Sequence, residues 1–203
     1  MRRAVIVLLS ITAAFGPDKL SAVDKKGAFR VEAATAYPGH VTQEKITVAA
    51  KPYNTTELAA EAFGKVKPHE HGILPVLVVI KNDTGKALSL ELAAQFVAAD
   101  GDHGEAMPPF DVQRYQGIQK RPGMKAPTAP LPIPRKKAKG PLNVPEIEGR
   151  AFSVKLVPPG ESVSGFFYFE ATDVKGAHLY LTGINDAASN QPYFYFEVPL
   201  DAK

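Results

Sequence analysis

Apolar and polar side chains alternate along most of the chain from residue 28 onward. Leu88, Leu90 and Leu92, for example, alternate with the polar Ser89 and Glu91, a period of two that is typical of a strand with one buried face. The run 76–80 is entirely apolar and predicts a central strand covered on both faces. Turn-forming residues separate the runs. The pattern predicts eight strands, at 28–34, 44–50, 74–81, 87–97, 151–157, 162–170, 177–184 and 192–199.

One segment has the signals of a short helix instead. Asn54 is a candidate N-cap, Glu57 follows three residues later, residues 58–63 are rich in alanine, and Gly64 is a candidate terminator. A further helical turn is expected after Pro108 and Pro109. Many short strands with one small helix favour an antiparallel β-sandwich, and a barrel is the alternative.

Two hairpin-like stretches carry a resemblance to a known class of domains. Residues 76–82, the turn 83–86 and residues 88–90 form the first, and residues 157–165 followed by 166–170 form the second. They resemble immunoglobulin-like domains of exported bacterial proteins over about residues 73–200. The resemblance implies an all-β, immunoglobulin-like antiparallel β-sandwich and brings no catalytic residues. The long insertion between the two hairpins departs from a plain sandwich and leaves the strand order open.

The N-terminus has the layout of a secretory signal peptide. Arg2 and Arg3 precede a mostly apolar stretch over residues 4–15, with small residues after it. This stretch would span about 18 Å as a helix, against about 30 Å for a bilayer core, so an uncleaved anchor is disfavoured; a buried N-terminal helix is the other alternative. We expect a signal peptide over residues 1–22, cleaved at one of two small-residue sites, and a single domain over 23–203.

Composition narrows the class of protein further. The chain has 203 residues, a net charge of +3 and no cysteine, which excludes a disulfide scaffold, a thiolate metal site and a cysteine nucleophile. Export without cysteine favours a bacterial periplasmic or extracellular location. The charge is too small to indicate nucleic acid as a partner.

Residues 108–145 form a long proline-rich basic insertion. They hold nine of the 18 prolines, and between Val112 and Pro145 there are eight basic residues and no acidic one. Such a segment favours extended polyproline conformations. It is predicted either to wrap the acidic remainder of the domain or to dock on an anionic partner, such as a lipid headgroup, polysaccharide or acidic protein. The candidate binding cations are Lys120, Arg121, Arg135, Lys136, Lys137 and Lys139.

Strand alternation also predicts an aromatic face. If the aliphatic positions of the last three strands face the core, five aromatic side chains share the outer face: Phe166, Tyr168, Tyr180, Tyr193 and Tyr195. Leaving them all in water is unfavourable. We expect either the proline-rich insertion or a carbohydrate or partner protein to cover them.

Candidate chemistry is limited to one histidine pair. His69 and His71 would lie on one side of an extended segment, where they could bind Zn²⁺ or Cu²⁺. A complete site would need one or two more ligands, for which the candidates are His40, His103, Asp100 and Asp102; the alternative is a solvated loop. Phosphate-binding and dinucleotide-binding glycine motifs are absent from the sequence, and no cofactor is predicted.

These observations favour an exported, non-catalytic binding or scaffold module of the cell envelope. The expected partners are an envelope protein, a polysaccharide or an anionic surface; nucleic acid is not expected, nor is a membrane span in the mature chain. The alternative is a metal-dependent or other hydrolytic enzyme that uses the His69 and His71 region. A third reading is a structural subunit that lends a strand or an arm to a neighbour.

Overall fold

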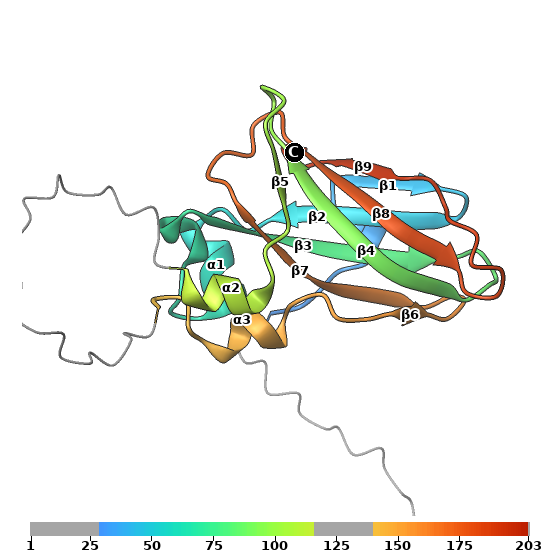
Figure 1. Ribbon diagram of the computed structural model, residues 1–203, viewed down its shortest axis with the longest axis horizontal. Coiled ribbons are helices and arrows are strands. Elements are labelled where there is room, and N and C mark those ends of the chain that lie inside the picture. Colours follow the sequence, from blue (N-terminus) through green and yellow to red (C-terminus); the bar gives the residue numbers. More distant parts are fainter. Residues whose placement is uncertain (1–28, 116–139, 203) are drawn as a thin grey trace, which may run out of the picture.

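The computed structural model describes residues 29–115 and 140–202 (Figure 1). The fold is mostly β, with two antiparallel sheets and few helices. The predicted signal peptide, residues 1–22, lies outside the described residues. Among those described, no helix is long and apolar enough to cross a membrane.

The first sheet has the order β1-β2-β3-β7, and the second has the order β5-β4-β8-β9, with β6 also paired to β4. The strands are β1 (His40–Gln43), β2 (Ile46–Pro52), β3 (Ile73–Asn82), β4 (Leu88–Val97), β5 (His103–Glu105), β6 (Leu156–Val157), β7 (Ser162–Glu170), β8 (His178–Asp186) and β9 (Phe196–Pro199). The helices are α1 (Thr56–Phe63), α2 (Pro109–Arg114) and α3 (Pro145–Gly149), and two 3₁₀ turns are η1 (Ala34–Ala36) and η2 (Pro68–His71).

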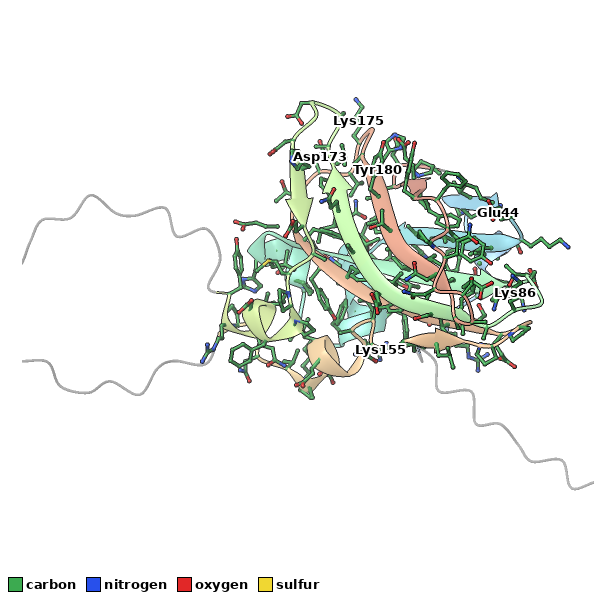
Figure 2. The ribbon with its side chains drawn as sticks, turned by 45° about the vertical axis from the view of Figure 1, so that its right-hand side comes forward. Glu44, Lys86, Lys155, Asp173, Lys175 and Tyr180 are labelled. Carbon is green, nitrogen blue, oxygen red and sulfur yellow. The ribbon has the colours of Figure 1, made fainter. Side chains whose placement is uncertain are left out.

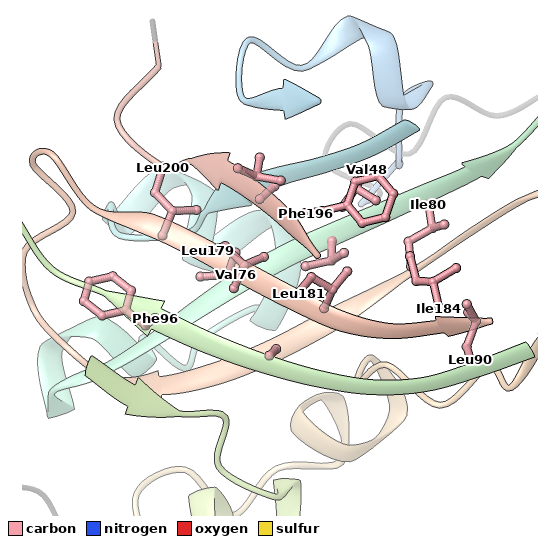
Figure 3. Close-up of a cluster of buried hydrophobic side chains, with 14 of the residues drawn as sticks. Val48, Val76, Ile80, Leu90, Phe96, Leu179, Leu181, Ile184, Phe196 and Leu200 are labelled. Carbon is pink, nitrogen blue, oxygen red and sulfur yellow. The ribbon is translucent and has the colours of Figure 1, made fainter. Parts of the chain in front are cut away.

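The main core fills the space between the two sheets (Figure 3). Val76 and Ile80 of β3 contribute from one side, and Leu179 and Leu181 of β8 contribute from the other. Each of these side chains is fully buried. Alternation therefore has the predicted result in β4 and β8, because their alternate apolar positions face the opposite sheet.

A second core lies on the other face of the first sheet. Leu77 and Val79 of β3 point into it, together with Phe63 of α1 and Ile147 of α3. The prediction that 76–80 is covered on both faces is confirmed, since the even positions belong to one core and the odd positions to the other. The helices form a third layer beside the first sheet (Figure 1).

Several predicted strand boundaries are wrong. Residues 29–33 form no strand and lead into η1, and 44–50 begins with a turn, so that Ile46 is the first residue of β2. Of 192–199, only residues 196–199 pair as a strand. Alternation was misleading in these places because short runs of apolar side chains also anchor loops to a core.

The predicted strand 151–157 instead crosses from one sheet to the other. The Phe152 N–H donates to the Phe166 carbonyl in the first sheet, and the Leu90 N–H in the second sheet donates to the Lys155 carbonyl. Only Leu156–Val157 is a strand. The segment therefore spans the open side of the two sheets rather than extending either one.

The predicted helix is present as α1, with a different cap. Thr55 is the N-cap, and its side-chain oxygen accepts a hydrogen bond from the Leu58 N–H at 3.3 Å, so the expectation for Asn54 is off by one residue. Gly64 ends the helix with φ of 65°, as expected of a glycine C-cap. The helical turn after Pro108 and Pro109 is α2, whereas α3 was not predicted.

Candidate binding surface

The five predicted aromatic residues do not share one surface. Phe166 and Tyr168 belong to β7 in the first sheet, whereas Tyr180 belongs to β8 in the second. Alternation correctly assigns Phe166, Tyr168 and Tyr180 to the side of their strands away from the main core, whereas Tyr193 packs against that core. It could not show that these outer sides face different directions, because that depends on which sheet each strand joins.

Phe166 and Tyr168 are buried, with 2% and 1% of their surfaces exposed. The Phe166 ring centroid lies 5.0 Å from those of both Tyr53 and Phe63. The Tyr168 hydroxyl donates a 2.7 Å hydrogen bond to the Ile147 carbonyl of α3. These two side chains are core residues of the second cluster, so the domain itself covers them, and the alternative that they form a binding face for a carbohydrate or partner protein is corrected.

The described ends of the proline-rich insertion help to bury the second cluster, to which Phe166 and Tyr168 belong. Val112 of α2 and Leu142 are both fully buried in the second cluster, so the ends of the insertion pack onto the domain. Arg114 lies over the Phe110 ring, 4.1 Å from its centroid. All six cations predicted to bind a partner lie outside the described residues: Lys120, Arg121, Arg135, Lys136, Lys137 and Lys139.

Tyr180 and Tyr195 meet on the outer face of the second sheet. Their rings stack with centroids 5.6 Å apart and planes 19° from parallel. Tyr195 is 53% exposed, and Tyr180 is half-buried. Tyr180 is paired with Gln95 of β4 on one side and with Glu197 of β9 on the other, so polar side chains flank the rings.

Glu197 organises the side chains around this tyrosine pair. The Tyr180 hydroxyl donates to the Glu197 carboxylate, and this hydrogen bond is the main reason that the Tyr180 pKa is raised. His178 Nδ1 also lies 3.2 Å from Glu197 Oε1, close enough for an ion pair but without hydrogen-bond alignment. The carboxylate thus fixes the outer end of the Tyr180 ring.

The connection from β8 to β9 is held in place by Asp186. One carboxylate oxygen accepts hydrogen bonds from the Ala188 and Ser189 N–H groups, and the other binds Lys86 Nζ at 2.7 Å. The Lys86 hydrogen bond and the two N–H groups lower the pKa of Asp186 to about 2. The Tyr193 N–H then donates to the Ile184 carbonyl. These hydrogen bonds fix the backbone that leads to residues 193–195, and therefore the position of their aromatic side chains.

A polar pocket of about 260 Å³ lies beside this connection. Its lining residues come from the β1–β2 turn, the β3–β4 turn and the β8–β9 connection: Glu44, Lys86, Asp186, Gln191, Pro192, Tyr193 and Phe194. Phe194 is 72% exposed at its edge. Figure 2 shows Glu44 and Lys86 at the same end of the molecule, with Tyr180 farther along β8. Tyr193 therefore lines this pocket and is not part of the Tyr180–Tyr195 stack.

The turn that supplies Glu44 has an unusual backbone. Glu44 and Lys45 have φ values of 47° and 64°, in the left-handed region where glycine or asparagine is usually found. Two consecutive positive φ values suit the tight turn between paired strands β1 and β2. Glycine adopts these φ values without strain. Glu44 and Lys45 therefore occupy the turn at a conformational cost that glycine would not have.

A further hollow of about 320 Å³ opens between the sheets beside the crossing segment. Leu92, Phe152 and Phe167 line it, and the last two rings stack at 5.4 Å. Its lining combines these half-buried apolar side chains with the exposed side chains of Gln95 and Glu105. This hollow marks where the two sheets diverge and holds no convergent polar groups of the kind that orient a small ligand.

The histidine pair does not assemble into a metal site. His69 and His71 lie in η2, and within residues 29–115 and 140–202 no three histidine, cysteine, aspartate or glutamate side chains are placed to share a metal ion. His40 instead contacts the Tyr37 carbonyl through Nδ1 at 2.6 Å. His103 is exposed on β5.

Comparisons with known proteins give no family for this chain. No family model matches it, and no curated protein matches it. Among solved structures, a Bordetella pertussis protein named ApaA is 10% identical, with 82% of this chain and 99% of that chain covered at a TM-score of 0.37. The Northeast Structural Genomics Consortium target SoR45 is 12% identical, with 79% and 91% covered at 0.34. Likenesses this weak do not bear on function.

Lys86, Asp186 and Glu44 were missed as candidates. Lys86 and Asp186 are 100 residues apart in the chain, and each looks like an ordinary turn residue on its own. One signal was present: a lysine and an aspartate each lie next to the end of a predicted strand, and the two strands concerned pair with each other.

Proposed function

We propose that this chain is an exported, non-catalytic binding module of the bacterial cell envelope, built on an immunoglobulin-like β-sandwich. Its binding surface is the β8–β9 surface, which we define as Tyr180, Tyr193, Phe194, Tyr195 and Glu197. The observation that carries the proposal is the exposure of Phe194 and Tyr195, two adjacent aromatic residues that are 72% and 53% accessible.

Exposed aromatic side chains in a cluster are typical of binding surfaces. A single exposed apolar residue needs no explanation, but adjacent ones beside a rigid polar network mark a site of contact. The aromatic residues here are also held in position, by the Tyr180 stack and by the Asp186 turn. A fixed aromatic surface loses little conformational entropy when a partner binds.

The charge of the β8–β9 surface favours one kind of partner over another. Among the residues of the β8–β9 surface, Glu197 is the charged one. A neutral envelope polymer therefore suits this surface better than an anionic one, since like charges repel. The hydrolase alternative lacks support among the described residues, where His69 and His71 have no third ligand beside them.

The binding role is tested by co-sedimentation with isolated cell envelopes. We expect the mature protein to sediment with envelopes, and the double variant Phe194→Ser with Tyr195→Ser to lose most of this binding. Phe110→Ser is the matched control, because Phe110 is 59% exposed on α2. Equal sedimentation of the double variant and the wild-type chain, or no sedimentation of either, would refute the proposal.

Export is tested separately by fractionation of the full-length chain in a bacterial host. We expect the protein in the periplasm or the medium, with a new N-terminus near residue 22. Replacing Arg2 and Arg3 with glutamate should retain it in the cytoplasm, because the basic start directs signal-peptide insertion. Full-length protein in the cytoplasm would contradict the export prediction without affecting the binding test.

A further inference from the structure

The polar pocket beside Phe194 combines groups of opposite character. Lys86 supplies an ammonium group, Glu44 and Asp186 supply carboxylates, and Gln191 and Tyr193 add groups that both donate and accept. A small set of convergent polar groups in a concave site is the usual basis of ligand orientation. This combination distinguishes the pocket from the apolar hollow between the sheets.

The charges in the pocket largely compensate one another. Lys86 Nζ is bound to Asp186 Oδ2 at 2.7 Å, which leaves the Glu44 carboxylate as the remaining charge. A strongly anionic ligand would meet two carboxylates and one occupied ammonium. An uncharged ligand rich in hydroxyl groups can donate to the carboxylates and accept from Gln191, Tyr193 and Lys86 without burying an unpaired charge.

Phe194 adds an apolar surface at the edge of this polar pocket. Its ring is 72% exposed, so a flat ligand has access to it. A pyranose ring has this dual character, with hydroxyl groups around its edge and C–H groups on its faces. The pocket volume of about 260 Å³ is just below the range of about 300–1,000 Å³ for sites that hold a whole small molecule, a size that suits a single sugar residue.

The tight β1–β2 turn places Glu44 at the pocket. Glu44 lines the pocket at φ of 47°, and Lys45 follows at φ of 64° without lining it. The same turn therefore offers one position that reaches the pocket and a neighbouring position that does not.

We propose that this pocket binds one neutral sugar residue of a polysaccharide, with the ring stacked on Phe194 and its hydroxyl groups bonded to Glu44 and Lys86. The inference rests on the proposed binding function and specifies the ligand class at the same end of the molecule. The tyrosine pair, farther along β8, would contact an adjoining part of the same polymer.

The test is calorimetric titration of the mature protein with four oligosaccharides. Three are neutral (cellotetraose, maltotetraose and tetra-N-acetylchitotetraose), and the fourth, tetragalacturonate, is anionic. We expect binding of at least one neutral tetrasaccharide and weaker binding of tetragalacturonate. Glu44→Gly should lower the affinity about tenfold or more, as expected for loss of a hydrogen bond to a charged group. Phe194→Ser should lower it similarly.

Lys45→Gly is the matched control. Both glycine variants relieve a positive φ, so both should unfold at the same or a higher temperature than the wild-type chain. Lys45→Gly should keep its affinity within twofold, and Glu44→Gly should not. Equal affinity in the two variants would overturn the assignment of the pocket. Tighter binding of tetragalacturonate, or no oligosaccharide binding by a chain that still sediments with envelopes, would overturn the ligand class and leave the proposed function intact.

Discussion

Phe152 lies directly over Gly165, so closely that a Cβ atom built on the glycine would be 2.4 Å from the Phe152 Cα. This contact lets the crossing segment reach β7, where the Phe152 N–H donates to the Phe166 carbonyl. The Phe152 ring then stacks on that of Phe167. The open side of the two sheets is thus closed by backbone contact at a position that only glycine allows.

Gly165→Ala is expected to destabilise the protein strongly. The added methyl group would meet backbone atoms rather than a flexible side chain, so the crossing segment must move. We expect a loss of about 3 kcal/mol, at the upper end of the overpacking range, measured by urea unfolding. Gly104→Ala is the control, because a Cβ there meets nothing within 4 Å; it should change stability by less than about 0.5 kcal/mol. A similar stability for both variants would contradict this account.

The Asp186 network predicts a dependence of stability on pH. The pKa of Asp186 falls from its usual 3.8 to about 2 in the folded chain, chiefly because of Lys86. A lowered folded-state pKa stabilises the protein above the unfolded value, and this contribution is lost as the pH falls from about 4 towards 2. Urea midpoints measured across this interval should fall less steeply for Asp186→Asn than for the wild-type chain. Parallel pH profiles would show that the ion pair does not contribute.

The Tyr180 hydroxyl should titrate differently when Glu197 is neutralised. The hydrogen bond to the carboxylate and the negative charge both raise the Tyr180 pKa. Glu197→Gln should therefore lower it, as measured by ultraviolet difference titration of tyrosinate formation. Subtracting the titration of Tyr180→Phe isolates this one residue among the seven tyrosines. An unchanged Tyr180 titration in Glu197→Gln would mean that the contact is not maintained in solution.

Tyr168→Phe tests the hydrogen bond that fastens α3 to the first sheet. The Tyr168 hydroxyl donates to the Ile147 carbonyl at 2.7 Å within the second core. Removing it leaves a buried carbonyl without that donor, at an expected cost of about 1–2 kcal/mol in thermal or urea unfolding. Tyr195→Phe removes a hydroxyl from an exposed ring and should leave stability nearly unchanged. Equal effects of the two variants would indicate that the bond adds no stability.

Alternation predicted the faces of individual strands well, because that property is local. The core-facing positions of β4 and β8 and the two-sided burial of β3 are all readable from a period of two or from its absence. Strand pairing is not local. Whether Tyr168 and Tyr180 are neighbours depends on which sheet each strand joins, and the period of two carries no such information.

The site was less predictable than the fold for a related reason. The Tyr180–Tyr195 stack joins two of the predicted aromatic residues, since Tyr195 immediately precedes β9, which pairs with β8. The sequence did not indicate a tight turn at Glu44, because a Glu-Lys pair is not usual in a turn with two positive φ values. Lys86 and Asp186 come together only once β4 and β8 pair.

The covering of β3 on both faces has a consequence for how this protein can change over time. The side chains of residues 76–80 are all buried. A mutation in that strand therefore disturbs the packing of one core or the other. The outward positions of β8 and β9 are under no such restraint. New specificities can therefore accumulate on the second sheet while the first preserves the scaffold that displays them.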